Sequence, residues 1–437
     1  KTLGCQMNEY DSNRILDLTK KINYVQTTLP EEANCYILNT CHIREKATEK
    51  VYSDIGRLKK NYRNKTKPFV FITGCVAQAE NEEMIRREPY IDAVIGPQSY
   101  QNIPNILSSL NNKTKKFNLT DFDVIEKFDK LNSLKNSDTN VSSFVTIQEG
   151  CDKFCNFCVV PYTRGSEYSR SPEEILKEVD HLVLNGAKEI TLLGQNVNAY
   201  LYKKKTKLSD LILKIGNNKK LKRVRYTTSH PKDMTDDLID CYKSEKKLMP
   251  FLHLPVQSGS DDVLKNMNRK HTREQYLDII AKLKKISPEI NFSSDFIVGY
   301  PGESQKDFDD TISLIKSVNF INSFSFIYSP RPGTPASRME MVDIKIQKKR
   351  LTILQNLLEK IQIKKNNDKI KKVEEVLVEN RLKNQNQYFG RTKDLTPVIL
   401  SDINDSDIGN IIKVRIDKCD KKSLFGKKCS NETEVAA

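Results

Sequence analysis

Three cysteines with the spacing C-x3-C-x2-C, Cys151, Cys155 and Cys158, are the residues of this sequence best suited to metal chemistry. They follow an apolar run, FVTIQEG, which ends in Gly150 and is predicted to be a β-strand. A [4Fe-4S] cluster usually takes four thiolates, so three on one tight loop would leave one iron open to a small molecule. A structural zinc site is the alternative, but it needs a fourth ligand, and the next candidate, His181, falls inside a predicted helix. The spacing favours an iron–sulfur cluster.

A second set of cysteines, Cys5, Cys41 and Cys75, closes three separate apolar runs, KTLGC, YILNTC and VFITGC. If these runs are parallel strands, the three thiols emerge at the same edge of the sheet, where α/β folds bind ligands. Free cysteine is also a common core residue, but three coincident strand-end positions favour a second cluster with three ligands. The remaining cysteines carry no such pattern and are expected to be structural: Cys35, Cys241, Cys419 and Cys429.

The elements around these cysteines predict an α/β multidomain chain. Residues 1–120 alternate apolar runs with amphipathic stretches, which predicts a parallel sheet flanked by helices. Residues 111–142 are polar and rich in Lys, Asn, Asp and Ser, which predicts little fixed structure, and the linker between the domains is predicted at 121–142. Residues 143–370 carry six strand–helix units, which predicts a partial (β/α) barrel with its chemistry at the carboxyl ends of the strands. Residues 371–434 carry four short β-like runs separated by turns, EEVLVEN, YFGRT, PVILS and IIKVRIDKC, and predict a small all-β barrel.

Bulk composition is ordinary except for its charge. The chain has 72 Lys and Arg against 57 Asp and Glu, a net charge of +15. This balance fits either a polyanionic partner such as nucleic acid or a generally basic proteome. No stretch approaches 18 consecutive apolar residues and no signal peptide is visible, so we expect no membrane span and a cytoplasmic location, although the sequence starts at Lys1 inside a predicted strand. Grouped cysteines without secretory features also indicate a reducing compartment.

The motif C-x3-C-x-aromatic-C, with Phe157 in the aromatic position, resembles that of the radical S-adenosylmethionine superfamily. The resemblance implies that the open iron chelates the methionyl group of S-adenosylmethionine and that an electron from the cluster releases a 5′-deoxyadenosyl radical. Together with the second cysteine triad and the terminal barrel, the motif makes the whole chain similar to the methylthiotransferase family. In that family the small barrel is a TRAM module, which binds RNA.

The residues around Cys5 and Cys41, GCQMNEYDS and NTCHIREKATEKV, resemble the branch that acts on isopentenylated adenosine beside the anticodon of tRNA. The branch that acts on threonylcarbamoyl-adenosine typically has GCKVN there, and the branch that acts on a ribosomal protein aspartate has GCPKN. The resemblance implies methylthiolation of the adenine at carbon 2. One S-adenosylmethionine would methylate a sulfur on the auxiliary cluster of the first triad, and a second would supply the radical that removes the hydrogen.

Residues that follow the core strands are candidates to contact S-adenosylmethionine. The candidates are Gln195 and Asn196 after the second strand, Ser229 after the third and Gln257 after the fourth, together with Phe157 in the cysteine loop. For Gln195 and Asn196 the alternative is that they only shape the turn.

The expected partners are a tRNA anticodon stem-loop, a reductase that donates electrons and a sulfur donor that the sequence does not identify. The target base would have to be splayed out of the loop to reach the core. A basic helical segment at 344–372 either contacts the tRNA backbone or forms a solvated face. Two other functions remain open: a methylthiotransferase for threonylcarbamoyl-adenosine tRNA or a ribosomal protein aspartate, and a non-catalytic iron–sulfur protein that binds RNA.

Overall fold

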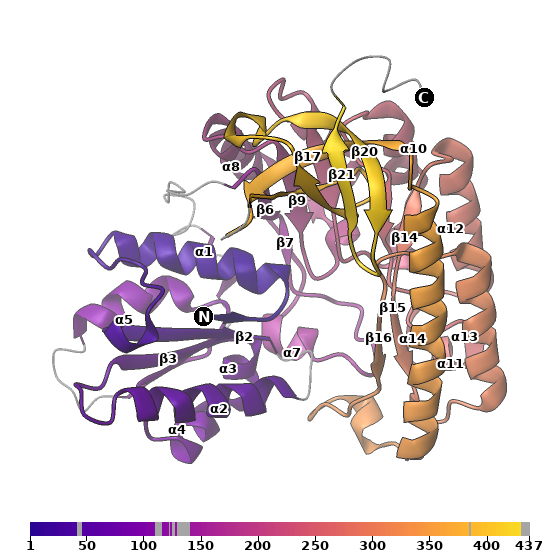
Figure 1. The fold of residues 1–437 in the computed structure, drawn as a ribbon. Helices are drawn as coiled ribbons and strands as arrows, with labels where there is room; N and C mark the ends of the chain where they lie inside the picture. The colour runs from indigo at the N-terminus through magenta and orange to yellow at the C-terminus, as the bar shows by residue number, and fades with distance from the viewer. Residues whose placement is uncertain are drawn as a thin grey trace.

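The structure, a computed structural model, has an amino-terminal α/β domain, a larger α/β core and a small β-barrel that sits on the core (Figure 1). It describes residues 1–41, 46–109, 116–121, 123–124, 127–128, 140–383 and 386–429. Part of the HIREK motif, most of the predicted linker and the last residues of the predicted barrel domain lie outside the described residues.

The amino-terminal domain is a parallel sheet with helices on both faces, as the alternating pattern predicts. Alternate residues of the central strand point to opposite faces, so Phe71 packs with one set of helices while Val70 and Ile72 pack with the other. In spatial order the strands are β1 (Thr2–Leu3), β2 (Cys35–Thr40), β3 (Phe69–Gly74), β4 (Ala93–Ile95) and β5 (Phe117–Leu119), and the helices are α1 (Gln6–Lys20), α2 (Lys46–Asn61), α3 (Cys75–Glu80), α4 (Glu82–Arg87) and α5 (Ile103–Ser109).

The prediction of little fixed structure beyond residue 111 is wrong in two places. Strand β5 pairs in parallel with β4, with Phe117 opposite Ala93. Further on, Phe128 is buried and stacks on Tyr168 of the core with ring centroids 5.8 Å apart, and Lys127 is fully buried beside it. A few apolar residues anchor these segments to the sheet and the core, although their neighbours in the sequence are polar.

The core contains the six predicted strand–helix units in an open arrangement, and the fifth strand is split at Ser294. Its first half pairs with the fourth strand and its second half with the sixth, so the sheet continues around the curve. The interior packs Val145, Leu192 and Val224 with residues of the later strands. The strands are β6 (Ser142–Thr146), β9 (Glu189–Leu193), β12 (Arg223–Tyr226), β13 (Phe251–His253), β14 (Asn291–Ser293), β15 (Asp295–Val298) and β16 (Phe324–Ile327).

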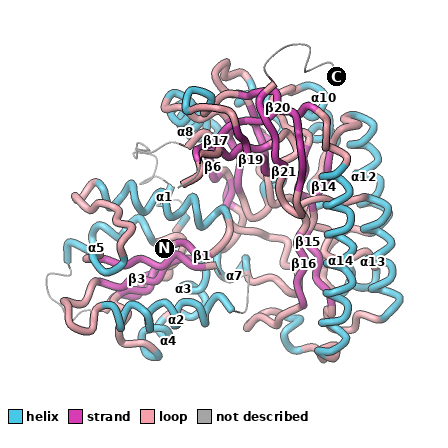
Figure 2. The backbone as a smooth tube through the Cα atoms, in the orientation of Figure 1, coloured by secondary structure: helices cyan, strands magenta, loops and turns pink. Residues whose placement is uncertain are grey.

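Helices cover the outside of the core, as the tube in Figure 2 shows on the side of β14 to β16. Side chains that accept backbone hydrogen bonds start several of them, including Thr272 and Ser304. Among the described residues, no helix combines the length and apolar character that a membrane crossing needs. The helices are α7 (Val160–Arg164), α8 (Pro172–Leu184), α9 (Leu208–Gly216), α10 (Asp236–Ser244), α11 (Asp261–Asn266), α12 (Arg273–Ile286), α13 (Gln305–Val318) and α14 (Ile344–Asn367). Two short antiparallel pairs accompany them: β7 (Gln148–Glu149) with β8 (Tyr168–Ser169), and β10 (Leu201–Tyr202) with β11 (Thr206–Lys207).

The carboxyl-terminal domain is a closed β-barrel, as predicted. Its interior is aliphatic and includes Val376, Val398 and Val414. The sequence pattern missed the last strand because that segment has only two apolar residues, Leu424 and Phe425. In order around the barrel the strands are β17 (Val373–Arg381), β18 (Tyr388–Arg391), β19 (Pro397–Ser401), β21 (Leu424–Lys428) and β20 (Ile411–Cys419).

Candidate active site

The cysteines of the amino-terminal domain, Cys5, Cys41 and Cys75, lie at one edge of its sheet. Each follows the carboxyl end of a parallel strand, and the strands β1, β2 and β3 are neighbours. Cys5 precedes α1 and Cys75 is the first residue of α3. The register places Thr40 opposite Gly74, so the cysteines that follow these two residues leave the sheet side by side.

Hydrogen bonds connect these thiols to one another and to the core. The hydrogen bond with Cys41 lowers the pKa of Cys5 to about 6, and the charge of Arg164 contributes in the same direction. The Cys5 thiol lies 3.3 Å from Oδ1 of Asn8, to which it donates. Nε of Arg164 donates to Sγ of Cys75 across 3.4 Å. The hydrogen bond with Cys41 and the charge of Arg164 therefore favour the thiolate of Cys5, the form of cysteine that binds iron.

The loop with Cys151 starts at a sharp turn. Gly150 has a φ of +75°, and a Cβ there would lie 1.9 Å from the backbone carbonyl oxygen of Ser166. Its N–H donates to Oε1 of Gln195 at 2.7 Å, and the N–H of Cys151 donates to the carbonyl of Gly165 at 3.1 Å. The side-chain oxygen of Gln195 thus holds the loop, which accounts for a polar residue at this strand end.

The other two cysteines of this loop are also held from several sides. Nη1 of Arg269 donates to Sγ of Cys155 at 3.6 Å, and the N–H of Val160 donates to Sγ of Cys158 at 3.4 Å. Burial raises the pKa of Cys151 to about 11 and that of Cys158 to about 12. These two thiols therefore need a bound metal to ionise at neutral pH.

Both triads provide a donor set that fits an iron–sulfur cluster. Within the described ranges, no three Cys, His, Asp or Glu side chains close around a point where one metal ion would fit. In a [4Fe-4S] cube each thiolate binds a different iron, so the thiols do not need to meet at one point. Cys155 and Cys151 nevertheless lie near enough to Cys158 to raise its pKa. Three thiols on one short loop thus fit a cube with one open iron.

A buried network of charges, which was not predicted from the sequence, connects the elements that carry the two triads. Arg164 donates to Asp11 at 2.9 Å and to Glu149 at 2.5 Å. Lys127 bonds to the same two carboxylates, at 3.4 Å and 2.6 Å. All four side chains are at most 2% exposed. Because Glu149 lies two residues before Cys151, the network connects the edge of the amino-terminal sheet to the core loop.

Several buried polar atoms at or next to the carboxyl ends of the core strands have no hydrogen-bond partner among the described residues: Oδ1 of Asn196, Oγ of Ser229, Nε2 of His230 and Nε2 of His271, which lies in the loop between α11 and α12 with its ring against His230. Nδ2 of Asn196 donates to Asp233 at 2.8 Å. Buried polar atoms without partners are rare because they cost free energy. This mouth is therefore suited to a polar ligand.

Two further candidates lie beside the mouth on the other wall of the core. Gln257 has a φ of +75° and its backbone bridges to Phe296 of β15. Phe157 packs against a cluster that includes Met267 and Tyr300. The structure thus brings Phe157 to the core wall and the other candidates to the strand ends, where the sequence pattern placed them.

Comparison with known proteins gives three matches along the chain. The model of the Radical SAM superfamily matches residues 145–315, a model described as uncharacterized protein family UPF0004 matches residues 1–96, and the TRAM domain model matches residues 369–429. The order of these matches agrees with the three parts of the fold.

Two solved structures have a similar fold. The radical S-adenosylmethionine methyltransferase TsrM from Kitasatospora setae, determined with cobalamin and a [4Fe-4S] cluster, has a TM-score of 0.55 at 11% identity, over 75% of this chain and 74% of that chain. The cobalamin-dependent S-adenosylmethionine radical enzyme OxsB has a TM-score of 0.50 at 12% identity, over 82% of this chain and 55% of that chain. These identities are low, so the likeness concerns the fold alone.

Relatives in sequence are much nearer. The tRNA-2-methylthio-N(6)-dimethylallyladenosine synthase of Pelagibacter ubique (strain HTCC1062) is 60% identical over 98% of this chain and 96% of its own length. The enzymes of the same name from Orientia tsutsugamushi (strain Boryong) and Wolbachia pipientis subsp. Culex pipiens (strain wPip) are 48% and 49% identical, over at least 98% of each chain. This chain therefore belongs to the tRNA-2-methylthio-N(6)-dimethylallyladenosine synthase family of radical S-adenosylmethionine enzymes.

Proposed function

We propose that this chain is a tRNA methylthiotransferase that converts isopentenyladenosine, 3′-adjacent to the anticodon, into its 2-methylthio derivative. The observation that carries the proposal is 60% identity over almost the full length to an enzyme of that name. The sequence GCQMN around Cys5 points to the same branch. The proposal disfavours the threonylcarbamoyl-adenosine and ribosomal protein branches, whose typical sequences at this position differ.

The chain uses two [4Fe-4S] clusters and S-adenosylmethionine. In our proposal, Cys151, Cys155 and Cys158 hold the radical-generating cluster, and Cys5, Cys41 and Cys75 hold the auxiliary cluster. When bound, the first supplies the electron that cleaves S-adenosylmethionine and the second supplies the sulfur. The protein holds the cysteine loop through Gly150 and Gln195, and Arg164 of α7, the helix that follows the loop, contacts Cys75 of the other triad.

The polar mouth of the core is the proposed place for S-adenosylmethionine. Asn196, Ser229 and Gln257 are buried there, and the first two present polar atoms without partners among the described residues. Phe157 fixes the wall beside the cysteine loop. The hydrogen at carbon 2 of adenine is not acidic at neutral pH, so a general base could not remove it. The radical has to be shielded from water to avoid side reactions, and the burial of most residues around the mouth agrees with this need.

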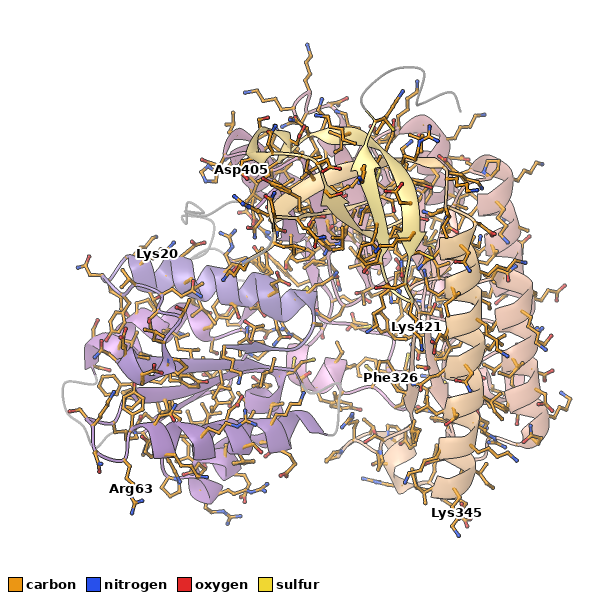
Figure 3. The ribbon with its side chains drawn as sticks, viewed as in Figure 1. Lys20, Arg63, Phe326, Lys345, Asp405 and Lys421 are labelled. Atoms are coloured by element: carbon orange, nitrogen blue, oxygen red, sulfur yellow. The ribbon has the colours of Figure 1, made fainter. Side chains whose placement is uncertain are left out.

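The substrate is tRNA, and the barrel domain is its proposed binding module. Basic residues continue along α14, where Lys345 projects from the end of the helix far from the barrel in Figure 3. Lys421 lies in the turn between β20 and β21 of the barrel and forms an ion pair with Glu359 of α14. These charges suit contact with a phosphate backbone. A reductase would supply electrons, and a sulfur donor that the sequence does not identify would supply sulfur. An enzyme with this substrate is expected in the cytoplasm.

The test is expression of the chain in a bacterial strain that lacks its own methylthiotransferase, followed by nucleoside analysis of bulk tRNA. We expect 2-methylthio-isopentenyladenosine to form at the expense of isopentenyladenosine. A methylthiolated threonylcarbamoyl-adenosine or ribosomal protein would contradict the proposed substrate. Anaerobic incubation with dithionite and S-adenosylmethionine addresses the non-catalytic alternative, since a protein that only binds RNA would form no 5′-deoxyadenosine.

A further inference from the structure

Arg164 lies between the two cysteine triads and contacts one of them directly. Its Nε donates to Sγ of Cys75 at 3.4 Å, and it closes the short helix α7 that begins two residues after Cys158. We infer that Arg164 is a positioning residue of the auxiliary cluster: it fixes Cys75 through an N–H···S hydrogen bond and so sets the reduction potential of the cluster that this cysteine binds. The inference rests on the proposed function, because it assumes that Cys75 is a cluster ligand.

The direction of the guanidinium is determined by its other partners. Nη2 donates to Asp11 of α1 at 2.9 Å, and Nη1 donates to Glu149 of β7 at 2.5 Å. These two contacts fix the plane of the guanidinium, and in that orientation its Nε–H faces Sγ of Cys75. Arg164 is 1% exposed, so bulk solvent does not reach this hydrogen bond. The planar fork of arginine makes the arrangement specific, because lysine could not bond to all three partners in fixed directions.

A purely structural role does not account for the contact with sulfur. Asp11 and Glu149 already have a second buried cation, Lys127, which bonds to both. The two cations and two carboxylates balance in charge without any cysteine. The contact of Arg164 with Cys75 is therefore additional to what the junction between the domains needs.

Hydrogen bonds to ligating sulfurs are among the factors that set the potential of an iron–sulfur cluster. A donor on a thiolate withdraws charge from it and stabilises the reduced, more negative state, which raises the potential. The auxiliary cluster should therefore have a higher potential with Arg164 than without it, while the cluster on Cys155 should not depend on this residue.

The experiment is a redox titration of the anaerobically purified full chain, followed by electron paramagnetic resonance. A Cys155→Ala background removes the radical cluster, so that the auxiliary cluster is observed alone. The test variant is Arg164→Lys, which keeps the charge and loses the Nε–H. The matched control is Lys127→Met, because Lys127 bonds to the same two carboxylates but contacts no cysteine.

We expect Arg164→Lys to shift the auxiliary potential in the negative direction and Lys127→Met to shift it much less. If Arg164→Lys loses auxiliary iron while Lys127→Met retains it, the positioning of Cys75 is likewise supported. Equal shifts, or equal iron loss, in the two variants would overturn the inference, since the network would then act only as a whole. Failure of the proposed function is seen separately, as a parent chain that binds fewer than about eight irons, the content of two [4Fe-4S] clusters.

Discussion

Nη1 of Arg223 donates a hydrogen bond to the backbone carbonyl oxygen of Arg391, 2.8 Å away. The first residue lies at the start of core strand β12, and the second lies in the carboxyl-terminal barrel. Arg225 adds hydrogen bonds to the carbonyl oxygens of Thr392 and Lys393. These hydrogen bonds fix the barrel at the amino ends of the core strands. The cysteine loop lies at the opposite ends of the strands, away from the barrel.

Replacement of Arg225 should loosen this junction. Its Nε bonds to Glu189 at 2.9 Å, and both side chains are at most 3% exposed. Arg225→Met would leave a buried carboxylate with weaker compensation, which typically costs about 3–5 kcal/mol. Urea denaturation should show this loss, and limited proteolysis between α14 and β17 should become faster.

The control for this prediction is Lys393→Met. Lys393 pairs with Glu375 at 2.9 Å, but both side chains are more than 40% exposed, so the loss should be about 0–1 kcal/mol. The carbonyl oxygen that Arg225 uses belongs to the backbone of Lys393 and is retained. If the two variants unfold at the same urea concentration, the junction does not depend on the buried arginine.

The cysteine loop depends on Gly150 in a way that iron analysis can measure. A side chain there would combine a positive φ with a contact of 1.9 Å to a backbone oxygen, which cannot move without the chain. Gly150→Ala should therefore displace Cys151, and iron should fall from about eight to about four per chain. Gly186 also has a positive φ, but no described atom lies within 4 Å of the position that a Cβ would take there, so Gly186→Ala should cost about 1–2 kcal/mol and keep its iron. Equal iron in the two variants would contradict the steric argument.

Local patterns in the sequence were sufficient to predict most of the fold. The cysteine spacing, the strand ends and the alternation of the barrel strands each involve residues close in the chain. Strand β5 was missed because Phe117 and Leu119 stand in a polar segment, and only pairing with β4 makes them a strand.

The buried charges could not be predicted in the same way. Arg164 and Lys127 look like surface residues until their shared partner Asp11 is placed beside them, more than 100 residues away in the sequence. A weak signal was present in PYTRGSEYSR, where charged residues follow the cysteine loop at once. Burial depends on contacts between domains, which no local pattern contains.

Two buried histidines at the mouth of the core should make stability sensitive to acid. Burial lowers the pKa of His271 to about 4 and lowers that of His230 further. An unfolded histidine titrates near about 6.5, so between pH 6.5 and 4 the unfolded chain binds protons that the folded chain does not. Stability should therefore fall as the pH falls, by about 1.4 kcal/mol per pH unit for each histidine.

Urea denaturation at several pH values checks this dependence. His271→Gln should reduce the slope of the free energy of unfolding against pH by the contribution of one histidine, about 1.4 kcal/mol per pH unit. This holds even if the variant is less stable at neutral pH. His181→Gln is the control, because His181 lies in the last turn of α8, outside the mouth. An unchanged slope in His271→Gln would contradict the assignment of the acid sensitivity to the mouth.

The two cysteine triads should separate in function when one ligand of each is removed. Cys75 begins α3 at the sheet edge, whereas Cys158 lies in the core loop, so Cys75→Ala should leave the radical site intact. Formation of 5′-deoxyadenosine should persist in Cys75→Ala, while the yield of the methylthiolated nucleoside should fall. Loss of a residue that only hydrogen-bonds to a metal ligand typically costs roughly 10–100-fold in activity, and loss of the ligand itself should cost more. Cys158→Ala should lose both products. Methylthiolation that survives in Cys75→Ala would remove Cys75 from the sulfur-donating site, and loss of 5′-deoxyadenosine in the same variant would mean that the two sites are not independent.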